Sequence, residues 1–100
     1  MEEGSYRQSR LCRLLGNPTA FTVVQLLAEN RQMSPSAIAK AVGRSVSRTS
    51  NILAALRLAE VVRYETEGRQ ARYRLKHPRE VRKLLDALSG FVKAASPVPR

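Results

Sequence analysis

The sequence predicts a mainly α-helical domain that carries one small β-hairpin. Three observations indicate this fold class. Apolar residues recur at helical spacing between residues 6 and 58, a glycine turn at Gly43 separates two short helical segments, and the apolar pattern changes to a period of two over residues 61–75. A further helical pattern follows at residues 78–95. We therefore expect about five helices and a two-stranded hairpin.

The first two helices are predicted from their apolar spacing and their end signals. Leu11, Leu14 and Leu15 lie on one side of a helix over residues 6–15, and Gly16 ends it. Asn17 then provides an N-cap and Pro18 occupies the first helical position. The segment that follows is densely apolar, so it is expected to form the central core helix.

The third and fourth helices are short and follow each other closely. Ser34 and Pro35 repeat the start signal, Gly43 permits the left-handed residue that ends a helix, and Ser45 caps the next one. In the fourth helix the inward positions are Thr49, Ile52, Leu53 and Leu56. The outward positions are Ser47, Arg48, Asn51, Ala54, Ala55 and Leu58.

Residues 61–75 are predicted to form a hairpin that turns at Glu67-Gly68. The expected pairs are Val62–Tyr73 and Tyr64–Ala71 on an apolar face, and Arg63–Arg72 and Val61–Arg74 on the opposite face. Like charges placed directly across a ladder destabilise it by some tenths of a kcal/mol. The hairpin is therefore expected to have a basic side that suits an anion.

The last helix begins at Pro78 and has a wide apolar stripe. Its members are Val81, Leu84, Leu85, Leu88, Phe91 and Val92. A stripe of this width is too large for a lone surface helix on a small domain. We expect another surface to cover it.

Composition limits the function. One hundred residues with 43% hydrophobic content fit a single domain over residues 1–100, with flexible ends at 1–5 and 95–100. A formal charge of +10 favours a polyanionic partner, with nucleic acid first and an anionic membrane surface second. The longest apolar run is too short for a signal peptide or a membrane span, so a soluble cytoplasmic protein is expected.

The sequence offers little for catalysis or metal binding. Cys12 is the single cysteine and His77 the single histidine, which excludes an internal disulfide and disfavours an ordinary zinc site. No nucleophile with a partnered base and no phosphate-binding loop are present. We therefore expect neither an enzyme nor a cofactor.

A winged helix-turn-helix consists of two helices joined by a short turn and followed by a β-hairpin, which is called the wing. The predicted third and fourth helices, the glycine turn between them and the hairpin follow this order. The second of these helices would enter the DNA major groove. There Arg48 could pair with guanine and Asn51 with adenine. Many exposed helices carry such residues only for solubility, but the glycine turn, the wing and the charge together favour the DNA-binding interpretation.

Three segments carry a resemblance to a known family: LLGNPTAFTVVQLLAE, SAIAKAVGRSVSRTSNILAALRLAEVV and VVRYETEGRQARYRL. Over roughly residues 11–93 the chain resembles the arsenic-repressor (ArsR/SmtB) family of winged-helix regulators. The resemblance implies a homodimer that represses transcription at palindromic operators until an inducer releases it. The first and last helices of each chain would form the dimer interface.

The resemblance also assigns sites. The implied groove-reading residues are Ser45, Val46, Ser47, Arg48, Ser50 and Asn51, and Arg44 directly before them is expected to bind DNA as well. The wing arginines are expected to contact phosphate because opposed arginines favour an anion; they are Arg63, Arg69, Arg72 and Arg74. Arg69 at the hairpin tip would approach the minor groove. The implied dimer-interface residues are Leu11, Leu15, Leu84, Leu85, Leu88 and Phe91.

The chain also departs from the family pattern. Ser34 stands at the usual metal-ligand position, which disfavours metal sensing, and Ile52 occupies a position that is often polar. Glu60 replaces a glycine, so a different local geometry is expected before the wing. Cys12 is more often a small core residue than a thiol that oxidises across a dimer axis.

The sequence is also compatible with two other functions. A sequence-indifferent chromatin- or RNA-binding protein would use the same arginines without base contacts. A protein-interaction module would use the last helix and carry its charge incidentally.

Overall fold

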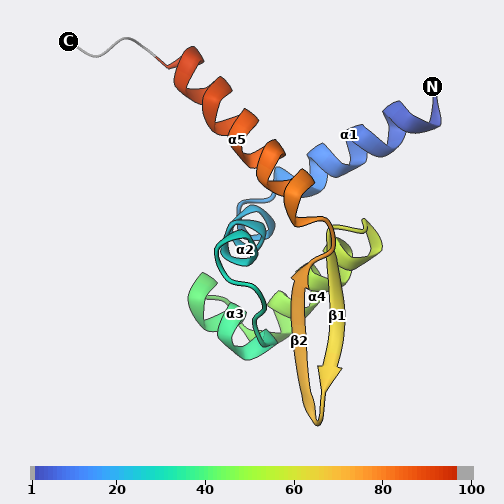
Figure 1. Cartoon of the computed structure of the whole chain (residues 1–100), viewed down its shortest axis with the longest axis vertical. Coiled ribbons are helices and arrows are strands. Elements are labelled where there is room, and N and C mark those ends of the chain that lie inside the picture. Colours follow the sequence, from blue (N-terminus) through green and yellow to red (C-terminus); the bar gives the residue numbers. More distant parts are fainter. Residues whose placement is uncertain (1, 97–100) are drawn as a thin grey trace.

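The computed structural model describes residues 2–96 and contains five helices and one hairpin in that range (Figure 1). The elements are α1 (Glu3–Leu15), α2 (Pro18–Glu29), α3 (Pro35–Val42), α4 (Val46–Leu58), β1 (Val62–Glu67), β2 (Gln70–Leu75) and α5 (Pro78–Ala95). The predicted fold class is confirmed. The first helix begins at Glu3 instead of residue 6, and residues 1 and 97–100 of the predicted flexible ends lie outside the described range.

The hydrophobic core lies where α2, α3, α4 and the hairpin meet. Its buried apolar side chains include those of α2 (Val23, Val24, Leu27), α3 (Ile38), α4 (Leu53, Leu56) and the hairpin (Val62, Leu75). Figure 1 shows α1 and α5 leaving this body in different directions at one end and the hairpin extending from the other. Three parts of the molecule therefore project beyond the core.

Side-chain caps fix where the central helices start. The Asn17 Oδ1 accepts a hydrogen bond from the Ala20 amide at 3.0 Å, and the Ser34 Oγ accepts one from the Ala37 amide at 3.2 Å. Each cap satisfies one of the amides that a helix start leaves without a partner. Gly43 ends α3 with φ of 69°, as the turn signal predicts.

The segment between α4 and the hairpin has the left-handed geometry that glycine usually supplies. Glu60 has φ of 66°. Its amide donates to the Arg57 carbonyl at 3.0 Å, and the Val61 amide donates to the Leu56 carbonyl at 2.9 Å, which is the Schellman arrangement. The expectation of a different geometry at Glu60 is wrong, because these two bonds hold a non-glycine residue in the same conformation.

The hairpin turns at Gly68-Arg69 instead of Glu67-Gly68. The register pairs Val62 with Leu75 and Tyr64 with Tyr73, so the predicted partners are each wrong by two residues. Gly68 has a positive φ at the first of the two loop positions, the pattern of a type II′ turn. A shift of two residues keeps every side chain on its own face, so the alternation alone does not determine the register.

Candidate nucleic-acid interface

The N-terminal half of α4 is held against the core on one side and open on the other. Thr49, Leu53 and Leu56 are 0% exposed. The Ser45 Oγ accepts a hydrogen bond from the Arg48 amide at 3.1 Å and thereby caps the helix. The first turn of α4 contains no acidic side chain, so its positive end attracts an anion.

All of the residues predicted for this segment are exposed in the structure. They are Arg44, Ser45, Val46, Ser47, Arg48, Ser50 and Asn51. Ala54, one turn after Ser50, is also exposed. The small side chains beside Arg48 and Asn51 leave the helix backbone free to approach another surface closely. The resulting strip, from Arg44 to Ala54, is called the α4 face below.

The second predicted group lies on the wing and is less uniformly basic than expected. Arg69 is exposed in the turn and Arg63 on β1, whereas Arg72 is half-buried and donates from Nη2 to the Gln70 Oε1 at 2.6 Å. Arg72 lies across from Glu65 and not from Arg63. The predicted Arg63–Arg72 pair is therefore wrong.

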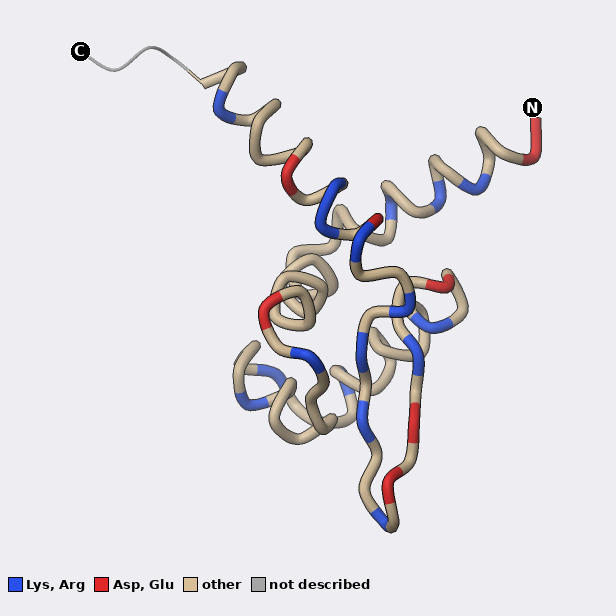
Figure 2. Tube along the Cα trace, in the orientation of Figure 1, with Lys and Arg blue, Asp and Glu red and all other residues tan. Residues whose placement is uncertain are grey.

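The acidic residue Glu65 divides the positive charge of the wing. Arg74 lies across from Arg63, and its Nε is 2.9 Å from the Glu65 Oε1. This ion pair neutralises one of the arginines that the sequence pattern leaves unpaired. Figure 2 shows Lys and Arg on both strands, interrupted by acidic residues on β1. Arg63 and Arg69 are the wing arginines most open to an anion.

A contact that sequence reasoning missed joins the wing to α4. The Arg57 guanidinium lies 5.3 Å from the centroid of the Tyr64 ring, and Tyr64 packs edge-on against Tyr73 with centroids 5.2 Å apart. Tyr64 is 40% exposed, so it is less buried than its place on the apolar face indicates. Burial raises the pKa of the Tyr73 hydroxyl, and the nearby Arg57 charge lowers it by less.

The wing is also tied to the α2–α3 connection. Met33 and Tyr73 exchange backbone hydrogen bonds of 3.0 and 2.9 Å. Together with the Arg57 contact, this bridge holds the hairpin on both sides. The wing therefore has a defined position relative to the α4 face. Two surfaces can contact one DNA duplex together only if their relative position is defined in this way.

The predicted dimer-interface residues fall into two groups. Leu84 and Leu88 are 37% exposed and Phe91 is 72% exposed. Leu11, Leu15 and Leu85 are half-buried and pack against the core. Val92, 63% exposed, continues the apolar stripe of α5. The outer part of α5 thus presents apolar side chains that the described chain does not cover.

The remaining candidates carry no site in the described residues. Cys12 is exposed on α1, so its interpretation as a core residue is wrong. His77 precedes α5 without a side-chain cap. Within residues 2–96, no three His, Cys, Asp or Glu side chains are grouped as metal ligands, and none of the helices combines the length and apolarity needed to cross a bilayer.

Known proteins share this sequence pattern and geometry. A protein-family model described as HVO_A0114 matches residues 17–82. The HTH-type transcriptional regulator KmtR of Mycobacterium tuberculosis is 33% identical over 88 residues, which make up 88% of this chain and 67% of KmtR.

Two solved structures show the fold. The homodimeric winged helix-turn-helix DNA-binding domain of Mb0332 from Mycobacterium bovis, a possible ArsR-family transcriptional regulator, has a TM-score of 0.82 and 23% identity, covering 94% of this chain and 85% of that one. The antimony-specific transcriptional repressor AntR has a TM-score of 0.76 and 24% identity, covering 94% and 85%. The chain therefore belongs to the HVO_A0114 family and to the HTH-type transcriptional regulators that KmtR represents, and it has the winged helix-turn-helix fold of the possible ArsR-family regulator Mb0332.

Proposed function

We propose that the chain is a homodimeric, sequence-specific regulator that binds double-stranded DNA and represses transcription at a palindromic operator. As part of this proposal it acts in the cytoplasm, the compartment that holds a prokaryotic chromosome. One observation carries the proposal. The α4 face is exposed along one side of a capped helix whose other side is enclosed by the core.

The chemistry of the α4 face suits the major groove, which is wide enough for one α-helix. The Arg48 guanidinium matches the two acceptors of guanine, and the Asn51 amide matches the donor and acceptor of adenine. Ala54 adds no side chain that would keep the backbone from the bases. The exposed Arg63 and Arg69 of the wing would contact phosphates beside the groove.

The apolar stripe of α5 supports the homodimer. Leu84, Leu88 and Phe91 lie on a helix that projects from the body (Figure 1). Two copies joined through this stripe, with α1 beside it, would bury apolar area on both chains and remove it from water. A two-fold axis through that interface would place two α4 faces on one side of the dimer, and such a dimer would bind a palindromic operator.

Repression is the mode that this arrangement favours. A dimer seated on an operator occupies DNA that a polymerase needs, and the similar fold of AntR belongs to a transcriptional repressor. An inducer would release the complex by binding better to a conformation that cannot bind DNA.

The direct test uses Asn51→Ala and the wild type on a duplex enriched from a random pool. Removing the hydrogen bonds to adenine should weaken specific binding by about 1 to 3 kcal/mol and relax the base preference at one position in each half-site. Fluorescence anisotropy on the selected duplex and on single-base variants measures both effects.

Gln25→Ala is the matched control, because Gln25 is an exposed amide on α2, a different helix from the one that carries the α4 face. It should leave affinity and base preference unchanged. Equal wild-type affinity for random and selected duplexes would instead favour the sequence-indifferent alternative, in which phosphate contacts supply the affinity.

A further inference from the structure

We propose that α1 provides a second DNA-backbone contact, in which Arg10 and Arg13 bind phosphates in the centre of the operator, between the two half-sites. The proposal rests on the proposed DNA-binding function and extends the interface to an element that neither the α4 face nor the wing includes. The partner is the phosphate backbone of the same duplex.

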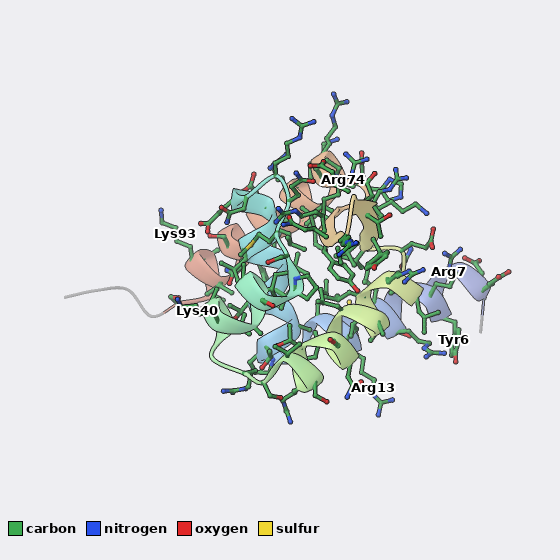
Figure 3. The ribbon with its side chains drawn as sticks, turned by 90° about the horizontal axis from the view of Figure 1, so that it is seen from below. Tyr6, Arg7, Arg13, Lys40, Arg74 and Lys93 are labelled. Carbon is green, nitrogen blue, oxygen red and sulfur yellow. The ribbon has the colours of Figure 1, made fainter. Side chains whose placement is uncertain are left out.

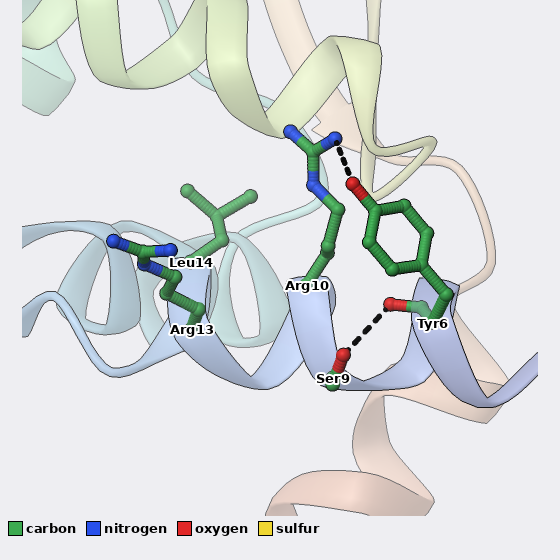
Figure 4. A pocket seen from close by; sticks show the side chains of 5 residues that line it. All are labelled: Tyr6, Ser9, Arg10, Arg13 and Leu14. Carbon is green, nitrogen blue, oxygen red and sulfur yellow. Dashed lines mark hydrogen bonds between the residues drawn. The ribbon is translucent and has the colours of Figure 1, made fainter. Parts of the chain in front are cut away.

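Four side chains of α1 gather on one side of the helix. Tyr6, Ser9, Arg10 and Arg13 are spaced by three, four and seven residues, which places them on one face. Together with Leu14 they line a single hollow (Figure 4). This group, without Leu14, is called the basic face of α1.

The basic face is preorganised by contacts within the helix. The Arg10 Nη1 donates to the Tyr6 hydroxyl at 3.3 Å, and its guanidinium lies 5.6 Å from the centroid of the Tyr6 ring. The Tyr6 hydroxyl accepts this bond and still has its own proton to donate. Arg10 therefore holds a defined position while most of its donors stay available for an anion.

The positive charge of the basic face of α1 is not balanced by carboxylates within residues 2–96. Neither Arg10 nor Arg13 forms an ion pair with a carboxylate in residues 2–96. Two arginines three residues apart on a helix repel each other. A phosphate placed between them would turn this repulsion into attraction, and guanidinium groups bind phosphate oxygens through two parallel hydrogen bonds.

The basic face lies beside the helix that carries the α4 face. Arg7, Arg10, Leu11 and Leu14 of α1 line one groove together with Ala55, Leu58 and Ala59 at the end of α4. Figure 4 shows Arg10 pointing from α1 towards α4, and Figure 3 shows Arg13 directed outwards at the edge of the molecule where α4 lies. A duplex seated on the α4 face would therefore pass the basic face of α1.

Dimer formation through the exposed apolar stripe of α5 would leave the basic face of α1 open. Leu11 and Leu15, the predicted interface residues of α1, are each about 160° around the helix from Arg13. Both leucines pack against the core of their own chain, so this side of α1 faces inwards and the basic face points away from it. Since α1 would lie near the two-fold axis and the wing far from it, the phosphates contacted by α1 would be central and those contacted by the wing peripheral.

The experiment compares wild type with Arg10→Gln/Arg13→Gln on the duplex that wild type selects from a random pool, over a series of salt concentrations. The double variant should bind at least tenfold more weakly. The plot of log K, where K is the binding constant for DNA, against the log of the salt concentration should become shallower by up to about four. Two arginines are removed from each chain of the dimer, and each lost arginine–phosphate pair lowers the slope by about one. The base preference should stay the same, because phosphate contacts carry no sequence information.

Arg31→Gln/Lys93→Gln is the control, since it removes the same charge from the α2–α3 connection and from α5. It should change the slope by less than half as much. Equal reductions in affinity for the two double variants would overturn the proposal, because net charge alone would then explain the effect. Circular dichroism and sedimentation check that both variants fold and dimerise.

A second measurement changes the DNA instead of the protein. Neutral methylphosphonates replace the central phosphates of the selected duplex in one set and the outermost phosphates in another. Central replacement should weaken wild-type binding at least tenfold and should not weaken the Arg10→Gln/Arg13→Gln variant further. Unchanged wild-type affinity after central replacement would contradict the α1 contact. A wild type without sequence preference would instead contradict the proposed function itself, before any variant is compared.

Discussion

Among residues 2–96, Glu60 is the only residue other than glycine that has a positive φ. Its conformation costs about 1 to 2 kcal/mol for an L-residue with a Cβ. The hydrogen bonds from the Glu60 and Val61 amides, and an ion pair between Glu60 and Lys76, hold it there. The hydrogen bond and the charge of Lys76 also lower the pKa of the Glu60 carboxyl. This residue links the end of α4 to the start of the wing.

Replacing Glu60 tests that strain. Glu60→Gly should be more stable than Glu60→Ala by about 1 kcal/mol, because both lose the Lys76 ion pair but only glycine removes the strain. Urea denaturation at neutral pH measures the difference. If Glu60→Ala were as stable as Glu60→Gly, the left-handed conformation would not be a source of strain.

Acid should weaken the Glu60–Lys76 contact in wild type. The folded pKa of Glu60 lies below its unfolded value, so the contact stabilises the fold above the unfolded pKa and loses that effect as pH falls through the folded pKa. The Glu60 carboxyl is exposed to solvent, and the effect is accordingly small. Neutral pH therefore suits the comparison of the Gly and Ala variants with wild type.

At the level of elements, capping serines start two consecutive helices, but only one of them lies on the proposed interface. Ser34 caps α3 and Ser45 caps α4 through the same side-chain contact to an amide three residues on. Ser34→Ala and Ser45→Ala should each destabilise the fold by about 1 kcal/mol. Only Ser45→Ala should also weaken DNA binding, because Ser45 belongs to the α4 face.

Thermal denaturation and anisotropy on the selected duplex measure the two effects separately. Ser34→Ala serves as the control for a general loss of stability. If both variants showed the same reduction in affinity for DNA, the reduction would come from destabilisation and the N-terminus of α4 would have no special role.

The elements also show what the sequence predicts well. Helix starts at Asn17, Ser34 and Ser45 are predicted correctly, because a cap is a local interaction between neighbouring residues. The exposed strip of α4 follows from helical periodicity in the same way. Both the fold and the most exposed part of the candidate site can therefore be predicted from local sequence patterns.

Other features depend on contacts that local patterns do not contain. The predicted hairpin register is wrong because a two-residue shift preserves both faces, and the ion pair between Glu65 and Arg74 appears only in the correct register. The contact of Arg57 with Tyr64 joins two elements, and no sequence spacing indicates it. The exposure of Cys12 likewise depends on how far α1 projects from the core.

For the whole molecule, the apolar stripe of α5 determines the expected assembly. Leu88→Glu should convert the dimer to a monomer, because two buried carboxylates would face each other near the two-fold axis without a partner. Sedimentation at micromolar concentration measures the change. DNA affinity should fall with it, since a monomer contacts one half-site.

Leu58→Glu is the matched control. Leu58 is 86% exposed on α4 and lies outside the proposed dimer interface. This variant should remain a dimer. If Leu88→Glu were still dimeric, the α5 stripe would not form the interface, and the palindromic operator would lose its structural basis.

The proposed regulator depends on two α4 faces binding one duplex in a symmetric, sequence-specific way. Selection of bound sequences from a random duplex pool by the wild-type protein tests this most directly. We predict enrichment of an inverted repeat whose half-sites are centred about one helical turn or a multiple of it apart. Enrichment of a single unpaired half-site, or no enrichment at all, would contradict a symmetric, sequence-specific dimer.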